Sequence, residues 1–112
     1  MKILVCDNLE KKVLEKFAEL GEITNISNSK TKTEELINNI ADTDIVVIRS
    51  STNINKDILQ EANQLKIIAR CGVGIDNIDI EEATTKKIYV TNSPNANIIS
   101  VAELTVGLII SA

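Results

Sequence analysis

Two arginines are the residues of this chain whose type and placement most clearly suggest chemistry. The chain has twelve basic residues, and all of them are lysines except Arg49 and Arg70. Each arginine ends a short apolar run, and the forked guanidinium group matches the geometry of carboxylate and phosphate groups. The pair therefore predicts a site for a small anion. The alternative is that each arginine pairs at the surface with one of the sixteen acidic residues.

Turn-forming residues follow both arginines. Ser50 opens a polar stretch after Arg49, and Gly72-Val73-Gly74 follows Arg70 closely. Hydroxyl groups, together with backbone N–H groups left free by a glycine-permitted turn, would add hydrogen-bond donors to a concave anion site. A third polar segment ends at Asn97, which either contacts the ligand or only caps the helix that follows it.

The glycine pair is only a partial match to a dinucleotide-binding loop. That fingerprint needs three glycines after the first strand of a βαβ unit, with an acidic residue about 20 positions further on. Here Gly72 and Gly74 follow the fourth predicted strand, and Asn77 stands where the third glycine would be. We therefore interpret the stretch as a cradle for a small anion.

The chain has few of the residues that other kinds of catalytic site require. There is no histidine, and the two cysteines, Cys6 and Cys71, lack the spacing of a zinc site. We therefore predict no catalytic residue and no metal ligand within these 112 residues.

Five β-rich runs alternate with amphipathic segments and would position these residues. Most of the runs are continuously apolar, as is typical of strands buried on both faces of a parallel sheet. The pattern predicts an α/β fold, a flavodoxin-like five-stranded parallel sheet of order 2-1-3-4-5 with helices on both faces. In that order the third and fourth strands are neighbours, so Arg49 and Arg70 would share one edge of the sheet. The predicted strands are residues 2–6, 22–26, 44–48, 66–70 and 88–91.

Helix boundaries follow from capping residues. Gly21 is expected at the C′ position of the helix that repeats apolar residues from Leu9 to Leu20. Residues 31–34 have the spacing of a capping box. Asn55 and Asp79 are expected to cap the third and fourth helices.

Composition limits the partners and the compartment. A net charge of −4 and only two aromatic residues argue against nucleic acid. The longest apolar tract, residues 106–110, is far shorter than the ~20 residues that span a bilayer. No export signal is evident, so we expect a cytoplasmic protein. Cys6 and Cys71 would lie two strands apart, about 9–10 Å, which is too far for a disulfide.

Three stretches of the chain resemble the D-2-hydroxyacid dehydrogenase family, and within it the N-terminal part of the D-3-phosphoglycerate dehydrogenases. They are VVIRSST (46–52), LKIIARCGVGIDNIDIEEATTKKIYVTNSPNAN (65–97) and SVAELTVGLIISA (100–112). The resemblance implies oxidation of 3-phosphoglycerate to 3-phosphohydroxypyruvate with NAD, the first step toward serine.

The resemblance also implies roles for individual residues. Gly72, Val73 and Gly74 would bind the substrate carboxylate through their backbone, with Val73 also near the nicotinamide. Arg49 and Ser50 match an Arg-Ser pair at the substrate, and Asn97 matches an asparagine at a domain junction. Arg70 is a second candidate cation at the substrate.

The family's catalytic histidine, its glutamate partner and its nucleotide-binding loop have no counterpart here. The resemblance therefore implies a substrate-binding domain over residues 1–97 and the start of an inter-domain helix over 98–112, with the NAD-binding domain absent. The last helix is apolar on nearly all faces and would need a partner, in the parent enzyme or in a homo-oligomer. Alone, the chain is expected to be inactive. The alternatives are a dehydrogenase of glycerate, lactate or glyoxylate, or a stand-alone anion-binding module.

Overall fold

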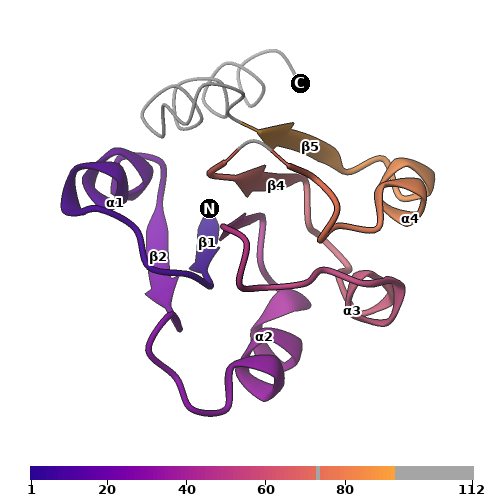
Figure 1. Cartoon of the computed structure of the whole chain (residues 1–112), viewed down its shortest axis with the longest axis horizontal. Helices are drawn as coiled ribbons and strands as arrows, with labels where there is room; N and C mark the ends of the chain where they lie inside the picture. The colour runs from indigo at the N-terminus through magenta and orange to yellow at the C-terminus, as the bar shows by residue number, and fades with distance from the viewer. Residues whose placement is uncertain (73, 93–112) are drawn as a thin grey trace.

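A single parallel sheet organises residues 1–72 and 74–92, which are the residues that the computed structural model describes (Figure 1). The sheet has five strands in the order β2-β1-β3-β4-β5, and all four pairings are parallel. This is the predicted flavodoxin-like order. The strands are β1 (Lys2–Val5), β2 (Glu22–Asn25), β3 (Ile45–Ile48), β4 (Ile67–Arg70) and β5 (Tyr89–Asn92).

The helices cover both faces of the sheet, as the fold class requires. Helix α1 (Lys11–Ala18) packs Val13 and Phe17 on one face. The other face carries α2 (Lys32–Ile40), α3 (Lys56–Gln60) and α4 (Ile80–Thr85). Figure 1 shows these three helices in a row on the side of the sheet away from α1.

Strands β3 and β4 have the burial that is typical of a parallel sheet. Every residue of the two strands is buried, and all of them except Arg70 are apolar. The apolar residues of β1 divide between the two cores, with Leu4 facing α2 and Val5 facing α1. The predicted strand bounds differ from the observed bounds by at most one residue at either end.

Two of the predicted helix caps are confirmed. The side chain of Asn55 accepts a hydrogen bond from the N–H of Ile58 at 3.0 Å. The side chain of Asp79 accepts one from the N–H of Glu82, also at 3.0 Å. These bonds satisfy backbone donors at the starts of α3 and α4 that have no partner within the helix.

Two other predictions about helix ends are wrong. Thr31 lies at the N-cap of α2, but its side chain makes no capping hydrogen bond, so the capping box does not form. Gly21 is not the C′ residue of α1, because the helix ends at Ala18 and its C-cap is Glu19. A Cβ atom on Gly21 would lie 2.1 Å from the carbonyl oxygen of Met1, so close approach to β1 is what requires glycine there.

The end of α4 forms a Schellman motif without a glycine. The N–H of Ile88 donates to the carbonyl of Ala83 at 2.9 Å, and the N–H of Lys87 donates to that of Thr84 at 3.0 Å. Lys87 occupies the C′ position with a φ of 60°, where glycine is the usual residue. The bonds satisfy the last carbonyls of the helix at the cost of a strained lysine backbone.

Candidate functional site

The carboxyl edge of the sheet brings the two arginines to adjacent strand ends. Arg70 is the last residue of β4 and pairs in register with Ile48 of β3, so that Arg49 follows directly on the neighbouring strand. Arg49 and Ser50 are exposed, whereas Arg70 is only 7% exposed. Among residues 1–72 and 74–92, neither arginine forms a salt bridge with an acidic side chain. The surface-pairing alternative finds no support in this part of the chain.

A buried carboxylate holds the segment that carries Arg49. Asp7 follows β1 and is 3% exposed. Its Oδ2 atom accepts a hydrogen bond from the backbone N–H of Arg49 at 2.7 Å. Its Oδ1 atom accepts from the hydroxyl of Thr52 at 2.7 Å and from Nζ of Lys32 at 3.0 Å. Asp7 therefore ties the end of β3 and the start of α2 to β1.

The environment of Asp7 keeps its carboxylate ionised. Burial is the largest single influence and raises the pKa of Asp7. Hydrogen bonds from the Arg49 N–H, Thr52 and Lys32, together with the positive charge of Lys32, outweigh burial and hold the pKa below its ordinary value of 3.8. With its donors already supplied, Asp7 serves as an anchor and not as a general base.

The glycine loop packs against the guanidinium group of Arg70. A Cβ atom on Gly72 would lie 2.7 Å from Nη1 of Arg70. One on Gly74 would lie 3.0 Å from Oδ1 of Asp76 and, at 3.8 Å, only in ordinary contact with Nη2 of Arg70. Gly72 also has a φ of +156°, which residues with side chains rarely adopt. The missing side chain of Gly72 therefore makes room for Arg70, a reason for glycine that the sequence pattern did not indicate.

Asn77 joins the two arginine-bearing segments. Its Oδ1 atom accepts a hydrogen bond from Nε of Arg70 at 2.8 Å. Its Nδ2 group donates to the carbonyl of Arg49 at 2.8 Å and to the carbonyl of Thr52 at 2.6 Å. The residue that replaces the third glycine of a nucleotide loop thus connects the ends of β3 and β4.

The two cysteines lie next to this site. Both are free thiols, as predicted, and both are buried. Burial raises the pKa of Cys6 to about 12. Burial also raises the pKa of Cys71 to about 11, although the charges of Arg49 and Arg70 oppose the rise. Neither thiol supplies a thiolate nucleophile near neutral pH.

Five of the seven predicted site residues lie together in the part of the chain that the structure describes. Arg49, Ser50, Arg70, Gly72 and Gly74 are all found at or just beyond the carboxyl edge of β3 and β4. Val73 and Asn97 lie outside the described residues, so their roles remain predictions. Sequence reasoning missed Asp7 and Asn77. A carboxylate directly after β1, beside the end of β3, was the available signal for Asp7.

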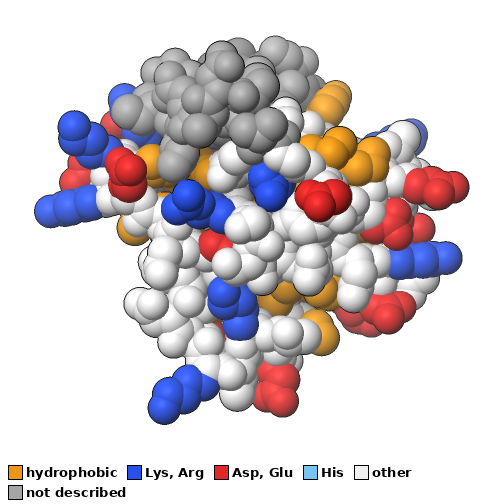
Figure 2. Space-filling model, viewed as in Figure 1, with side chains coloured by type: hydrophobic (Ala, Val, Ile, Leu, Met, Phe, Trp, Pro, Cys, Tyr) orange, Lys and Arg blue, Asp and Glu red, His pale blue; other side chains and the backbone are white. Residues whose placement is uncertain are grey.

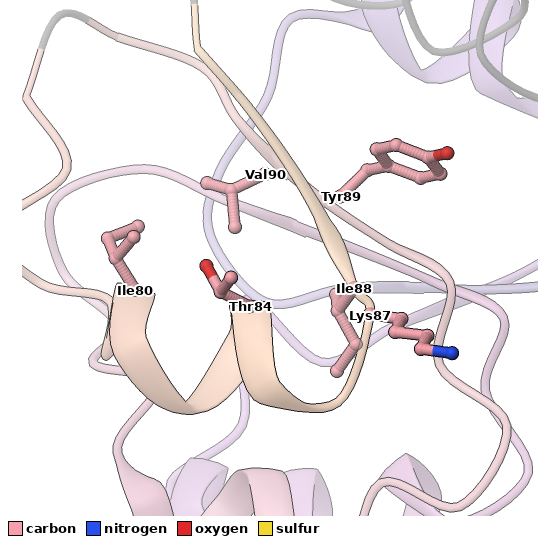
Figure 3. Close-up of a pocket in the computed structure, with 6 residues that line it drawn as sticks. All are labelled: Ile80, Thr84, Lys87, Ile88, Tyr89 and Val90. Carbon is pink, nitrogen blue, oxygen red and sulfur yellow. The ribbon is translucent and has the colours of Figure 1, made fainter.

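A second feature lies away from the arginines. A hollow of about 530 Å³ opens between α4 and the edge strand β5, lined by Ile80, Thr84, Lys87, Ile88, Tyr89 and Val90. Figure 3 shows Thr84 and Val90 pointing toward one another across it, with the Tyr89 ring turned away from the helix. Its lining is mostly apolar and includes none of the predicted site residues.

Other kinds of site receive no support from residues 1–72 and 74–92. These residues contain no cluster of three or more His, Cys, Asp or Glu side chains that could hold a metal ion. None of their helices is long and apolar enough to cross a membrane. On the face shown in Figure 2, basic and acidic side chains are interspersed, so no broad basic surface is evident there.

Comparison with known proteins identifies relatives over the whole length of the chain. D-3-phosphoglycerate dehydrogenase from Methanocaldococcus jannaschii is 47% identical over 112 residues, which are all of this chain and 21% of that protein. Hydroxypyruvate reductase from Thermotoga maritima is 37% identical over 110 residues, 98% of this chain and 36% of that protein. The chain thus spans about a fifth of the length of the first of these relatives and about a third of the second.

A solved structure shows the same fold. The NAD⁺-bound 3-phosphoglycerate dehydrogenase of Entamoeba histolytica superposes with a TM-score of 0.74 at 37% identity, covering 98% of this chain and 38% of that one. The family model described as "D-isomer specific 2-hydroxyacid dehydrogenase, catalytic domain" matches residues 3–107. These matches confirm the resemblance predicted from the sequence, and the chain belongs to the D-isomer specific 2-hydroxyacid dehydrogenase family.

Proposed function

We propose that this chain is the substrate-binding part of an NAD-dependent D-3-phosphoglycerate dehydrogenase. The parent enzyme would oxidise 3-phosphoglycerate to 3-phosphohydroxypyruvate, at the start of serine biosynthesis. The observation that carries the proposal is the pair Arg49 and Arg70 at adjacent strand ends, without an acidic partner among the described residues. A substrate with a carboxylate and a phosphate supplies two anionic groups for two guanidinium groups.

The chain's own residues would bind and orient this substrate. Arg49 and Ser50 are exposed at the edge of the sheet and would contact it directly. Gly72, Val73 and Gly74 would offer backbone N–H groups to the carboxylate, with Val73 beside the nicotinamide and Asn97 at a domain junction. Arg70 would be the second cation.

The described residues do not form a dinucleotide site of their own. A Rossmann domain places a glycine-rich loop after its first strand, but β1 is followed here by Cys6 and the buried carboxylate of Asp7. A negative charge at that point opposes a pyrophosphate. NAD, which supplies hydride transfer when bound, would therefore be held mainly by a separate domain, and we expect the 112-residue chain alone to be inactive.

The arrangement of the parent follows from the same proposal. Residues 1–97 would form the substrate domain and residues 98–112 the start of an inter-domain helix. The parent would act in the cytoplasm as a homo-oligomer. Activity of the isolated chain on a 2-oxo acid with NADH would contradict this division between the domains.

The test is substitution of Arg49 in the full-length protein. Loss of one charge-assisted contact is worth about 1.5–3 kcal/mol, so Arg49→Ala should weaken 3-phosphoglycerate binding by roughly 10- to 100-fold. D-lactate, which lacks the phosphate, should lose much less. Lys66→Ala is the control, because Lys66 is an exposed cation just before β4, at the opposite edge of the sheet. Equal losses for both substrates would contradict the phosphate assignment.

A second candidate is a dehydrogenase that acts on an unphosphorylated acid. The 37% identity to the hydroxypyruvate reductase of Thermotoga maritima favours it. Under this alternative, Arg49→Ala would weaken D-glycerate and 3-phosphoglycerate binding to the same extent. The comparison of substrates therefore separates the two candidates.

A further inference from the structure

We propose that Asn77 is a positioning residue of the anion site, which aligns Arg70 with the segment carrying Arg49 while leaving both positive charges available. This inference rests on the proposed function, because its consequence is measured on a phosphorylated substrate. It concerns a residue that the fold class and the glycine pattern leave without a role.

The hydrogen bonds of Asn77 fix the orientation of its amide. The oxygen accepts from Nε of Arg70 at 2.8 Å, whereas both bonds of the nitrogen run to carbonyl oxygens, those of Arg49 and Thr52. The reverse orientation would place a donor against a donor and an acceptor against two acceptors. The side chain therefore has one satisfied orientation.

The backbone of Asn77 is also anchored. Its carbonyl accepts a hydrogen bond from the N–H of Ile54 at 2.8 Å, and the carbonyl of Ile54 accepts from Asp79 at 2.9 Å. Ile54 and Ile78 form an isolated parallel bridge beside it. Asn77 is thus attached by its backbone and its side chain to the residues that follow β3. Its hydrogen bond with Nε therefore fixes the Arg70 side chain relative to those residues.

The contact with Nε decides which part of the Arg70 guanidinium stays available. Nη1 and Nη2 make no hydrogen bond with any residue of 1–72 or 74–92. Nη1 lies against the side-chain-free surface of Gly72, and Nη2 lies near Gly74, where the exposed carboxylate of Asp76 is also close but forms no salt bridge with Arg70. Two parallel donors of this kind can bind a carboxylate or phosphate in a bidentate manner. Asn77 occupies the side of the guanidinium and leaves this end to a ligand.

The side chain of Asn77 is uncharged, and this distinguishes it from an aspartate at the same position. Aspartate could accept the same hydrogen bond from Nε, but it would neutralise the charge of Arg70 at a nearly buried position, where ion pairing is strong. It would also face the carbonyl oxygens of Arg49 and Thr52 with a negative oxygen. Asparagine orients Arg70 without consuming its charge, as an anion site requires.

The experiment compares Asn77→Asp with Asn77→Ala in the full-length protein. The readouts are KM and kcat for 3-phosphoglycerate, the inhibition constant of D-glycerate as an unphosphorylated competitor, and the melting temperature. Asn63→Ala is the matched control, because Asn63 is exposed just before β4, at the opposite edge of the sheet. Arg49→Ala is measured in parallel as the test of the proposed function.

We expect Asn77→Asp to raise KM for 3-phosphoglycerate at least about tenfold, with a much smaller change for D-glycerate, because the loss of a positive charge removes more attraction from a ligand that carries a carboxylate and a phosphate than from one that carries a carboxylate alone. Both substitutions should lower the melting temperature, because each removes the hydrogen bonds to the carbonyls of Arg49 and Thr52. If Asn77→Ala fails to fold, Asn77→Asp alone decides the question. A purely structural role would change both ligands equally, and that result would overturn the proposal.

The experiments distinguish a wrong role for Asn77 from a wrong substrate. If Arg49→Ala discriminates between the ligands and Asn77→Asp does not, only the positioning role of Asn77 is wrong. If Arg49→Ala does not discriminate either, the phosphorylated substrate is wrong, and the inference about Asn77 is overturned with it.

Discussion

Replacement of Asp7 by asparagine should lower the free energy of unfolding by about 3 kcal/mol, although the two side chains have nearly the same shape. Asp7 is 3% exposed and accepts hydrogen bonds from Arg49, Thr52 and Lys32. Asparagine keeps one accepting oxygen and replaces the other with a donor. The amide oxygen should stay against the backbone N–H of Arg49, which cannot turn away, so Thr52 and Lys32 are the two donors that lose their acceptor.

The estimate of the lost stability follows from the strength of the hydrogen bonds and from how far the donors can adjust. Hydrogen bonds to a charged group contribute about 1.5–3 kcal/mol each, which gives roughly 3–6 kcal/mol for two. The hydroxyl of Thr52 can rotate and accept from the new amide, and the Lys32 side chain is 27% exposed and can turn toward water. Both adjustments recover part of the loss, so the lower end of the range applies.

Equilibrium urea denaturation of the two proteins measures the difference. Asp42→Asn is the control, since Asp42 forms its salt bridge with Lys2 at 2.7 Å where both side chains are more than half exposed. Water screens such a pair, so its loss should change stability little. If Asp7→Asn were no more destabilising than Asp42→Asn, the buried network would not be an anchor, and the reasoning would be refuted.

The dependence of stability on pH provides an independent check. Because the pKa of Asp7 is lowered in the folded state, its ionised form stabilises the protein fully above the ordinary pKa of 3.8. That contribution is lost as the pH falls below 3.8 toward the lowered folded value. The difference in stability between the wild type and Asp7→Asn should therefore shrink below about pH 4 and stay constant above about pH 5.

Three further predictions test other parts of the fold. Lys87→Gly should raise the free energy of unfolding by about 0.5–1 kcal/mol in the same assay, because it removes the strain of a φ of 60° at the C′ position of α4; a loss of stability would argue against that backbone conformation. Gly21→Ala should lower the free energy by about 2 kcal/mol, since its methyl group would lie 2.1 Å from the Met1 carbonyl oxygen, and a neutral result would mean that the chain terminus moves freely. Cys6 and Cys71, with pKa values raised to about 12 and about 11 by burial, should resist a thiol reagent at pH 8 in the native protein and react once it is unfolded; rapid reaction of either thiol in the native state would show that it is accessible.

The strands and their order could be predicted because they depend on short-range patterns. Continuous apolar runs such as residues 45–48 and 67–69 indicate burial on both faces whatever the details of packing. Asn55 and Asp79 act on N–H groups three residues away, so local sequence suffices for their caps. The placement of Arg49 beside the end of β4 followed from the strand order alone.

Contacts between residues distant in sequence could not be predicted in the same way. Gly21 was assigned to a helix end, but its neighbour in space is Met1. Asp7 receives donors from residues 25, 42 and 45 positions away. Thr31 has the residue type and spacing of a capping box, yet its N–H donates to the Ser29 hydroxyl and its own side chain does not cap α2. Such features depend on backbone positions that only the folded chain defines.

The glycine pair and Arg70 are separate motifs in the sequence but lie in contact in the structure. In the sequence, Gly72 and Gly74 indicate a loop with free N–H groups, and Arg70 indicates a cation. In the structure the guanidinium lies against the loop, where a side chain on Gly72 would meet Nη1 at 2.7 Å. Because only glycine leaves that space, the loop admits a nearly buried arginine, and Asn77 then holds it by Nε. The residues that lack the third glycine of a nucleotide loop thus hold a nearly buried cation, which is what the proposed anion site requires.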